Sequence, residues 1–128
     1  MLDETIRRLA TEGTNIAAVT TLMPDGTPQT TPVWIDADGD HILVNTEVHR
    51  QKYKNVTRDP RVTVTIWEAA NPWIYGEVRG TVVETVTGPA ARSHIDELSR
   101  KYVGHDYANP IQSERVILKV APVRQWAR

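Results

Sequence analysis

The chain has 128 residues, 40% of them hydrophobic, which is enough for one compact domain with an ordinary core and too few for two. Its formal net charge is −1, whereas proteins that bind nucleic acids or membrane surfaces in general carry a large excess of basic residues. Neither a nucleic acid nor a membrane is therefore expected as a partner. The absence of cysteine excludes disulfides, thiolate catalysis and cysteine-bound metals. No secretory signal or membrane-spanning run is visible, so a cytoplasmic protein is the default expectation.

The first predicted elements are a short helix and three strands. Leu2, Ile6 and Leu9 recur at helical spacing, and Gly13 offers a stop. Three β-type runs follow, with turn residues at 24–26 and 36–40 between them; the runs are Ile16–Leu22, Gln29–Ile35 and His41–Thr46. Connections this short predict that the three strands form an antiparallel meander.

A polar segment then interrupts the strands. His49–Arg58 is compatible with a helix, which the following Asp59-Pro60 would end. Arg61–Trp67 alternates strictly and predicts a half-buried strand. Trp73–Val86 predicts a long strand, whose two glycines indicate bends or close backbone approaches; they are Gly76 and Gly80.

The last predicted elements are a helix and a strand. Gly88-Pro89 opens the helix, whose apolar stripe consists of Ala91, Ile95, Leu98 and Tyr102. The final strand is Ser113–Val123. Six strands with two to three small helices are too many for a βαβ sheet of this length, and closing the sheet removes exposed edges. The predicted fold is therefore mainly β, a six-stranded antiparallel barrel in a single domain, residues 1–128.

The densest chemistry lies between residues 45 and 61. Asn45 and Thr46 end a predicted strand, and three basic residues follow near the start of the helix: Arg50, Lys52 and Lys54. A helix N-terminus exposes unpaired amide groups, and basic side chains beside it complete a pocket for an anion. A solvated helix face remains the alternative interpretation.

Aromatic residues supply a second candidate feature. Trp73 and Tyr75 are two residues apart, which places them on one face of the predicted strand, and Trp34 and Trp67 are further candidates. Such side chains can form a flat wall for a conjugated ring. Packing in the core or in a dimer is the alternative for each of them.

No metal site is expected. The spacing of Asp36, Asp38, Asp40 and Glu47 resembles a calcium loop, but Gly39 stands at the wrong position and the second half reads as a strand. The four histidines show no metal-ligand spacing, and each is expected to be a surface or hydrogen-bonded residue.

The order of these elements resembles the pyridoxamine-phosphate-oxidase-like split barrel, the FMN-binding split barrel, over nearly the whole chain. Within that superfamily the chain is most similar to the actinobacterial flavin/deazaflavin oxidoreductases of class B. The segments that carry the resemblance are 25–29, Pro32-Val33-Trp34, and 50–55 leading to 58–62.

The resemblance implies a cofactor site and a homodimer. It assigns Arg50, Lys52 and Lys54 to the grip on the cofactor phosphate. It assigns the lining of the ring to two strand segments, which comprise Gln29, Thr30, Thr31, Pro32, Val33, Trp34, Asn45 and Thr46. Trp73 and Tyr75 would come from the partner subunit, and no catalytic residue is assigned.

Two departures from the oxidases favour coenzyme F420, an 8-hydroxy-5-deazaflavin, over FMN. Thr31 and Asp36 stand where the oxidases carry basic residues for the FMN phosphate, and the oxidases' C-terminal Arg/His motif is absent from 124–128. The resemblance thus implies an F420-dependent reductase that transfers a hydride to a small conjugated or quinone-like substrate. The alternatives are an F420 carrier without turnover, or a split barrel that binds FMN or haem.

Overall fold

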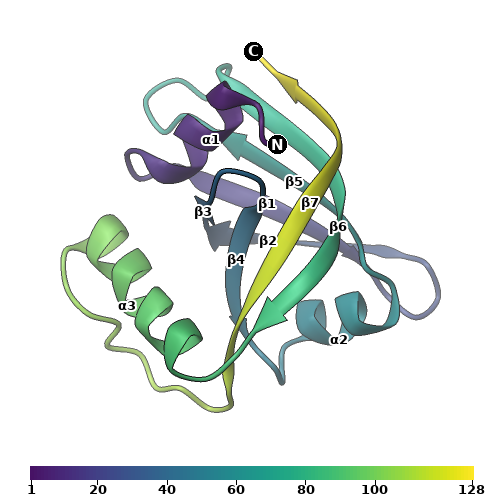
Figure 1. Ribbon diagram of the computed structural model, residues 1–128, viewed down its shortest axis with the longest axis vertical. Coiled ribbons are helices and arrows are strands. Elements are labelled where there is room, and N and C mark those ends of the chain that lie inside the picture. Colours follow the sequence, from purple (N-terminus) through teal and green to yellow (C-terminus); the bar gives the residue numbers. More distant parts are fainter.

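A computed structural model describes residues 1–128 as one antiparallel sheet with three helices around it (Figure 1). Helix α1 lies at one end of the sheet, α2 near the other, and α3 beside β4 (Figure 1). In chain order the elements are α1 (Glu4–Thr11), β1 (Ile16–Leu22), β2 (Pro28–Trp34), β3 (Asp36–Ala37), β4 (Ile42–Glu47), α2 (Gln51–Arg58), β5 (Arg61–Trp67), β6 (Tyr75–Val86), α3 (Pro89–Val103) and β7 (Arg115–Ala127).

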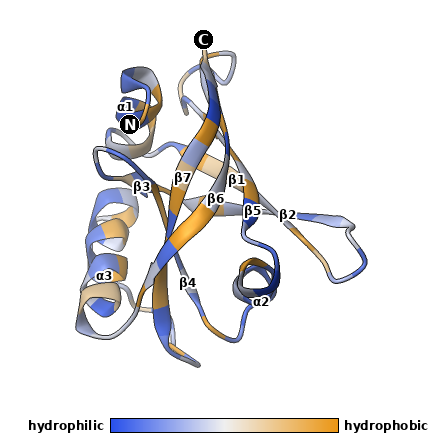
Figure 2. Ribbon diagram, turned by 45° about the vertical axis from the view of Figure 1, so that its right-hand side comes forward, coloured by the Kyte–Doolittle hydropathy of each residue, from blue (hydrophilic) through white to orange (hydrophobic).

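The sheet is a coiled half-barrel of seven strands in the order β2-β1-β5-β6-β7-β4-β3. Every neighbouring pair is antiparallel. The long strands β6 and β7 cross in front of β1, β2 and β5 in Figure 1, and hydrophobic residues colour their central parts in Figure 2. The two edge strands, β2 and β3, are consecutive in the chain, and Ile35 is the single residue that connects them.

The predicted barrel of six strands is corrected in two respects. Asp36 and Ala37, assigned to a turn, form the short strand β3, which pairs with Leu43 and Ile42 and raises the count to seven. The predicted meander is also wrong, because β1 pairs with β2, whereas β4 pairs with β3 and β7 and not with β2.

The backbone of Ile35 gives the physical reason why the meander does not form. Its N–H donates to the Tyr102 hydroxyl at 3.1 Å, and its carbonyl oxygen accepts from Lys101 Nζ at 2.7 Å. Burial raises the pKa of Tyr102 to about 12, so its hydroxyl keeps its proton, which it donates to the Asn15 carbonyl oxygen. Side chains of α3 thus replace the partners that a continuing strand ladder would supply.

The periodicities read from the sequence are confirmed where they concern the core. Leu2, Ile6 and Leu9 are all below 5% exposed, and Asp3 caps α1 by accepting from the Thr5 and Ile6 amides. One face of β5 is buried, as its alternation predicts, through Val62, Val64 and Ile66. The apolar stripe of α3 is buried at Ala91, Ile95 and Leu98, and its last member, Tyr102, is half-buried.

Element boundaries differ from the predicted ones by a few residues. The second helix begins at Gln51 instead of His49, and the long strand at Tyr75 instead of Trp73. The last strand is Arg115–Ala127, so it extends further toward the C-terminus than Ser113–Val123. None of the helices has the length and apolar composition needed to cross a membrane.

Strand β2 is an edge strand that contains two prolines. Pro28 and Pro32 pair in register with Leu22 and Ala18 of β1, and both are exposed. Proline has no N–H to donate, so within a sheet it is tolerated where the N–H would face away from the neighbouring strand.

Gly80 provides a test of the packing between β6 and β7, which shift register at this point. A Cβ atom there would lie 2.1 Å from the Ala121 carbonyl oxygen, a backbone atom that cannot rotate away. We expect Gly80→Ala to lower the free energy of unfolding by about 2–3 kcal/mol in urea denaturation. Gly39→Ala, where a Cβ meets no atom within 4 Å, is the control, with an expected change below about 0.5 kcal/mol. Equal effects of the two substitutions would contradict the steric account.

Candidate functional site

The candidate site is a cavity of about 350 Å³ between the sheet, the start of α2, and α3. It combines an apolar side with a cationic side, and no carboxylate is among its lining residues. These are Ile16, Pro32, Val33, Trp34, Asn45, Arg50, Lys52, Ile95, Leu98, Tyr107, Asn109 and Arg115.

Aromatic rings build part of the apolar side. Trp34, at the end of β2, stacks on Tyr102 of α3 with ring centroids 5.3 Å apart and an angle of 6° between the planes. Tyr107, in the loop after α3, meets Trp34 edge-on at 6.3 Å. Ile95 and Leu98 add the aliphatic face of α3. The rings hold each other in place, so this wall is rigid enough to receive a flat ligand.

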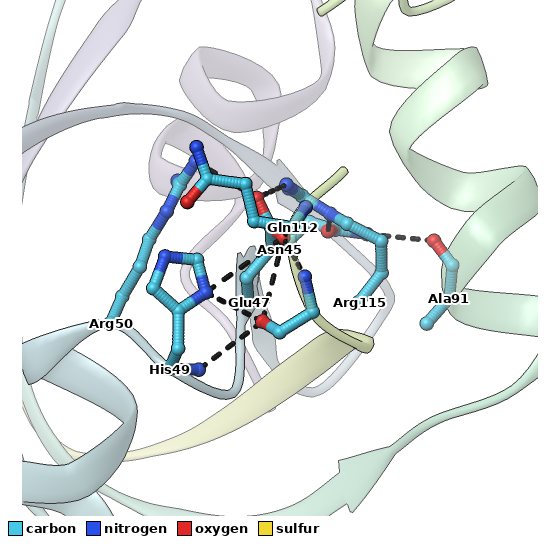
Figure 3. Close-up of polar contacts among 8 residues, drawn as sticks. Asn45, Glu47, His49, Arg50, Ala91, Gln112 and Arg115 are labelled. Carbon is cyan, nitrogen blue, oxygen red and sulfur yellow. Dashed lines mark hydrogen bonds and ion pairs between the residues drawn. The ribbon is translucent and has the colours of Figure 1, made fainter. Parts of the chain in front are cut away.

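Glu47, at the end of β4, organises the cationic side although it is only 1% exposed (Figure 3). Its Oε1 accepts from the Gln112 and Ser113 amides at 2.8 and 2.7 Å. Its Oε2 accepts from Arg50 Nη2 at 3.2 Å and Arg115 Nη1 at 3.3 Å. Burial raises the pKa of Glu47, but these amides and guanidinium groups outweigh burial and hold the pKa below its usual value.

Arg115 fixes the orientation of Asn45 in the cavity wall. Because Nε of Arg115 can only donate, the group facing it at 2.9 Å must be the Asn45 carbonyl oxygen Oδ1. Nδ2 of Asn45 then donates to the Ala91 carbonyl oxygen and to Nδ1 of His94, both at 3.0 Å. His94 thereby carries its proton on Nε2, which donates to Asp36 Oδ2 at 2.9 Å.

The contact with His94 affects the Asp36 carboxyl. Burial raises the pKa of Asp36, but the hydrogen bonds from His94 and from the Ala37 amide more than offset it and keep the pKa below its usual value. A continuous polar chain therefore runs from β3 through α3 and β4 to β7, and Asn45 and Arg115 are its members in the cavity wall.

Lys52 has neither a hydrogen-bond partner nor an ion pair, although it is half-buried in the cavity wall. Burial lowers the pKa of its amine, and the positive charges of Arg50 and Arg115 lower it further. Helix α2 begins beside it with no side-chain cap, and the Tyr53 and Lys54 amides donate to the Arg50 carbonyl oxygen, so the amides of Gln51 and Lys52 are the ones available to a ligand. An anion in the cavity would relieve this repulsion between cations.

The structure brings about half of the predicted site residues together. Six of them line the cavity, namely Pro32, Val33, Trp34, Asn45, Arg50 and Lys52. Gln29, Thr30 and Thr31 lie further along β2 and do not reach it, and Lys54 is exposed on α2. Thr46 follows Asn45 in β4, so its side chain points to the opposite face of the sheet, where it is 1% exposed.

The prediction that Trp73 and Tyr75 share one strand face is wrong. Trp73 lies in the turn before β6 and is 76% exposed, because the chain bends at Asn71 and Pro72 before the strand begins. Tyr75 is half-buried and packs against Trp126 at 5.2 Å between ring centroids. Neither residue lines the cavity within this chain.

Sequence reasoning missed the residues that other elements contribute to the cavity. Arg115 is 4% exposed and directly precedes three buried apolar residues of β7, Val116, Ile117 and Leu118, and a charge in such a position is a signal for a buried functional group. Tyr107 and Asn109 come from a loop whose sequence carries no such signal, and Ile95 and Leu98 were assigned only to the core. His94 agrees with the expectation of a hydrogen-bonded histidine.

The fold and the cavity together define the chain as a split-barrel protein. It belongs to the pyridoxamine 5'-phosphate oxidase family, whose profile matches residues 2–127. No curated protein matches the sequence.

Solved structures of the same fold include one described as an F420 reductase, with 29% sequence identity, a TM-score of 0.81 and coverage of 98% of both chains. The conserved hypothetical protein Rv2991 from Mycobacterium tuberculosis is 22% identical at a TM-score of 0.70, over 99% of this chain and 84% of that one. HupZ from Group A Streptococcus is 16% identical at a TM-score of 0.67, over 99% of this chain and 94% of that one. The last two similarities concern the fold alone.

Glu47→Gln tests the organising role of the buried carboxylate. The amide would place a donor against two guanidinium groups and leave Arg115 buried without a counter-charge. We expect a loss of about 3–5 kcal/mol in the free energy of unfolding at neutral pH. Glu84→Gln, which removes an exposed carboxylate 3.7 Å from Lys119 Nζ, is the control and should cost less than about 1 kcal/mol.

The effect of Glu47→Gln should depend on pH in a defined direction. A lowered carboxyl pKa stabilises the fold fully above the unfolded-state pKa of about 4.3, and this stabilisation is lost as pH falls through the folded-state value. The stability difference between wild type and Glu47→Gln should therefore narrow on acidification, as measured by urea denaturation at a series of pH values. A difference that grows toward low pH would contradict this account.

Proposed function

We propose that this protein is an oxidoreductase that binds a flavin-type cofactor in the cavity, with coenzyme F420 preferred over FMN. The supporting observation is a single cavity lined both by the aromatic rings of Trp34 and Tyr107 and by three cations, Arg50, Lys52 and Arg115. That combination fits a ligand with a conjugated ring and an anionic tail. The 29% identity to the F420 reductase over nearly the full chain also supports the proposal.

In this proposal each part of the cavity has one task. The strand end at Val33 and Trp34 supports the ring, while Lys52, Arg50 and the uncapped start of α2 hold the phosphate. When bound, the deazaflavin supplies hydride chemistry, and the substrate class is a small conjugated or quinone-like molecule. No histidine or carboxylate lines the cavity, and Lys52 is assigned to the phosphate, so solvent is the proposed source of the proton.

The preference for F420 over FMN rests on β2 and β3. Family oxidases hold the FMN phosphate with basic residues at the positions of Thr31 and Asp36. Here the Thr31 hydroxyl is buried without a partner, and Asp36 is an acid paired with His94. Neither residue can neutralise a phosphate monoester.

Side-by-side titration with F420 and FMN tests both the site and the ranking. F420 should bind more tightly, and Lys52→Ala should weaken its binding about 10- to 100-fold because a charge-assisted contact is lost. Affinity should fall as salt rises, and also as pH rises through the lowered pKa of Lys52, since the neutral amine no longer attracts the anion. Lys119→Ala, on β7 outside the cavity, is the control for net charge.

The titration has clear contrary outcomes. Tighter FMN binding would reverse the ranking, and unchanged affinity in Lys52→Ala would remove Lys52 from the site. Oxidation of reduced F420 by enone and quinone acceptors then tests for turnover. Tight binding without turnover would favour an F420 carrier.

We also propose that two copies of the chain form a homodimer through apolar residues on β6 and β7 and the turn before β6. Trp73, Val123 and Trp126 are 76%, 74% and 52% exposed there, which is unusual for large apolar side chains. Light scattering at micromolar concentration should give twice the monomer mass, and Val123→Asp should shift it toward the monomer. Val103→Asp, at a residue 52% exposed on α3, is the control. A wild-type monomer would contradict the proposal.

A further inference from the structure

His94 is a buried histidine on α3 that reaches the cavity only through another residue. It is 6% exposed and is not among the lining residues. Its Nε2 donates to Asp36 Oδ2 at 2.9 Å, and its Nδ1 accepts from Asn45 Nδ2 at 3.0 Å. The Asp36 carboxylate can only accept, so it selects the tautomer of the neutral ring in which both nitrogens are satisfied.

The Asn45 amide, which does line the cavity, has one satisfactory orientation. Its Oδ1 accepts from Arg115 Nε at 2.9 Å, and its Nδ2 donates to His94 and to the Ala91 carbonyl oxygen (Figure 3). Turning the amide over would set Nδ2 against the Arg115 Nε–H and Oδ1 against the Ala91 carbonyl oxygen. Asn45 is 9% exposed, so water cannot compensate for these mismatched pairs.

A second proton on His94 conflicts with this arrangement. The imidazolium donates from both nitrogens, so its Nδ1–H would face the donor Nδ2 of Asn45. Protonation also turns the contact with Asp36 into an ion pair, which keeps the buried ring in place. The amide is therefore the group that must turn, and Arg115 then loses the acceptor that holds its Nε.

The charged groups around His94 leave the histidine as the group that titrates near neutral pH. Asp36 of β3 contacts the ring, and Lys101 of α3 acts on Asp36. Arg115 of β7 and Glu47 of β4 follow along the same polar chain. At both carboxylates burial is outweighed by hydrogen-bond donors, which hold the pKa of Asp36 and of Glu47 below the usual value. Both stay ionised where histidine side chains titrate, between about pH 5 and 8.

We propose that His94 is a positioning residue for the cavity: its neutral form holds Arg115 in place through Asn45, and protonation of Nδ1 releases Arg115. The guanidinium lies over the Tyr107 ring at 5.2 Å, and both residues line the cavity, so its release changes the wall that a ligand meets. The inference deepens the proposed function and rests on it only for the identity of the ligand.

Nitrogen-15 NMR tests this coupling in the protein without ligand. At about pH 8, His94 should show the tautomer protonated on Nε2, and Arg115 a protected Nε–H signal. On acidification the Arg115 signal should weaken with the same midpoint as the His94 titration. Exchange of guanidinium protons ordinarily slows in acid, so the expected change has the opposite sign. A constant Arg115 signal while His94 gains its proton, or a His94 that titrates only as the protein unfolds, would overturn the inference.

Two substitutions then connect the coupling to ligand binding. His94→Asn places an amide oxygen near the position of Nδ1, which can accept from Asn45 but takes up no proton. Wild type and His94→Asn should bind F420 about equally at about pH 8, and wild type at least about tenfold more weakly at about pH 5. Titration of the ligand itself cancels in this ratio. His49→Asn is the matched control, because it removes an exposed histidine 3.9 Å from Glu47, and it should follow wild type.

The sign of the pH dependence excludes two simpler explanations. A positive His94 that acted through space would attract an anion, so wild-type binding that is tighter than that of His94→Asn in acid would overturn the inference. Deprotonation of Lys52 weakens binding as pH rises and cannot cause a loss in acid. A flat profile in His49→Asn would assign the effect to the pair of His49 and Glu47, and would likewise overturn the inference.

Failure of this inference is distinguishable from failure of the proposed function. If F420 binds with the same pH profile in wild type and in His94→Asn, His94 is a structural residue and the proposed function stands. If the Arg115 signal follows His94 but neither F420 nor FMN binds, the inference stands and the proposed cofactor is wrong. If His94→Asn does not fold, the NMR titration of the wild-type protein decides.

Discussion

A buried carboxylate is the constraint on which the cavity depends. Glu47 ends β4, and its two oxygens bind the chain at Gln112 and Ser113 on one side and two arginines on the other. A carboxylate that is 1% exposed persists as an ion only when it is fully satisfied, and here its contacts join two distant parts of the chain, residues 112–115 and Arg50. The same atom group therefore fixes the loop before β7, the start of α2 and the guanidinium in the cavity wall.

Asn45 connects this carboxylate, through Arg115, to the helix that forms the apolar side of the cavity. The amide is held by Arg115, and it in turn bonds to α3 at Ala91 and His94. Helix α3 also contributes Ile95 and Leu98 to the wall. The apolar and cationic parts of the cavity wall are thus joined in one hydrogen-bonded assembly, because α3, which shapes the apolar part, is tied through Asn45 to Arg115.

The sequence predicted those features that depend on neighbouring residues. The faces of α1, α3 and β5, the close approach at Gly80 and the basic cluster at Arg50 and Lys52 follow from local spacing. The pairing of β4 with β7 does not follow from local spacing, because the two strands are far apart in the sequence, and neither do the bonds from residues 101 and 102 to the backbone of Ile35. Arg115 and Tyr107 reach the cavity by long-range packing, and no periodicity records it.

The prolines of β2 have a consequence for how the protein behaves at high concentration. An open sheet edge is a template on which another chain can add a strand and begin aggregation. Pro28 and Pro32 stand four residues apart on the outer strand and donate no N–H, so that edge offers a broken series of donors to an incoming strand. The half-barrel can therefore leave β2 uncovered beside its cavity and still resist polymerisation through that edge.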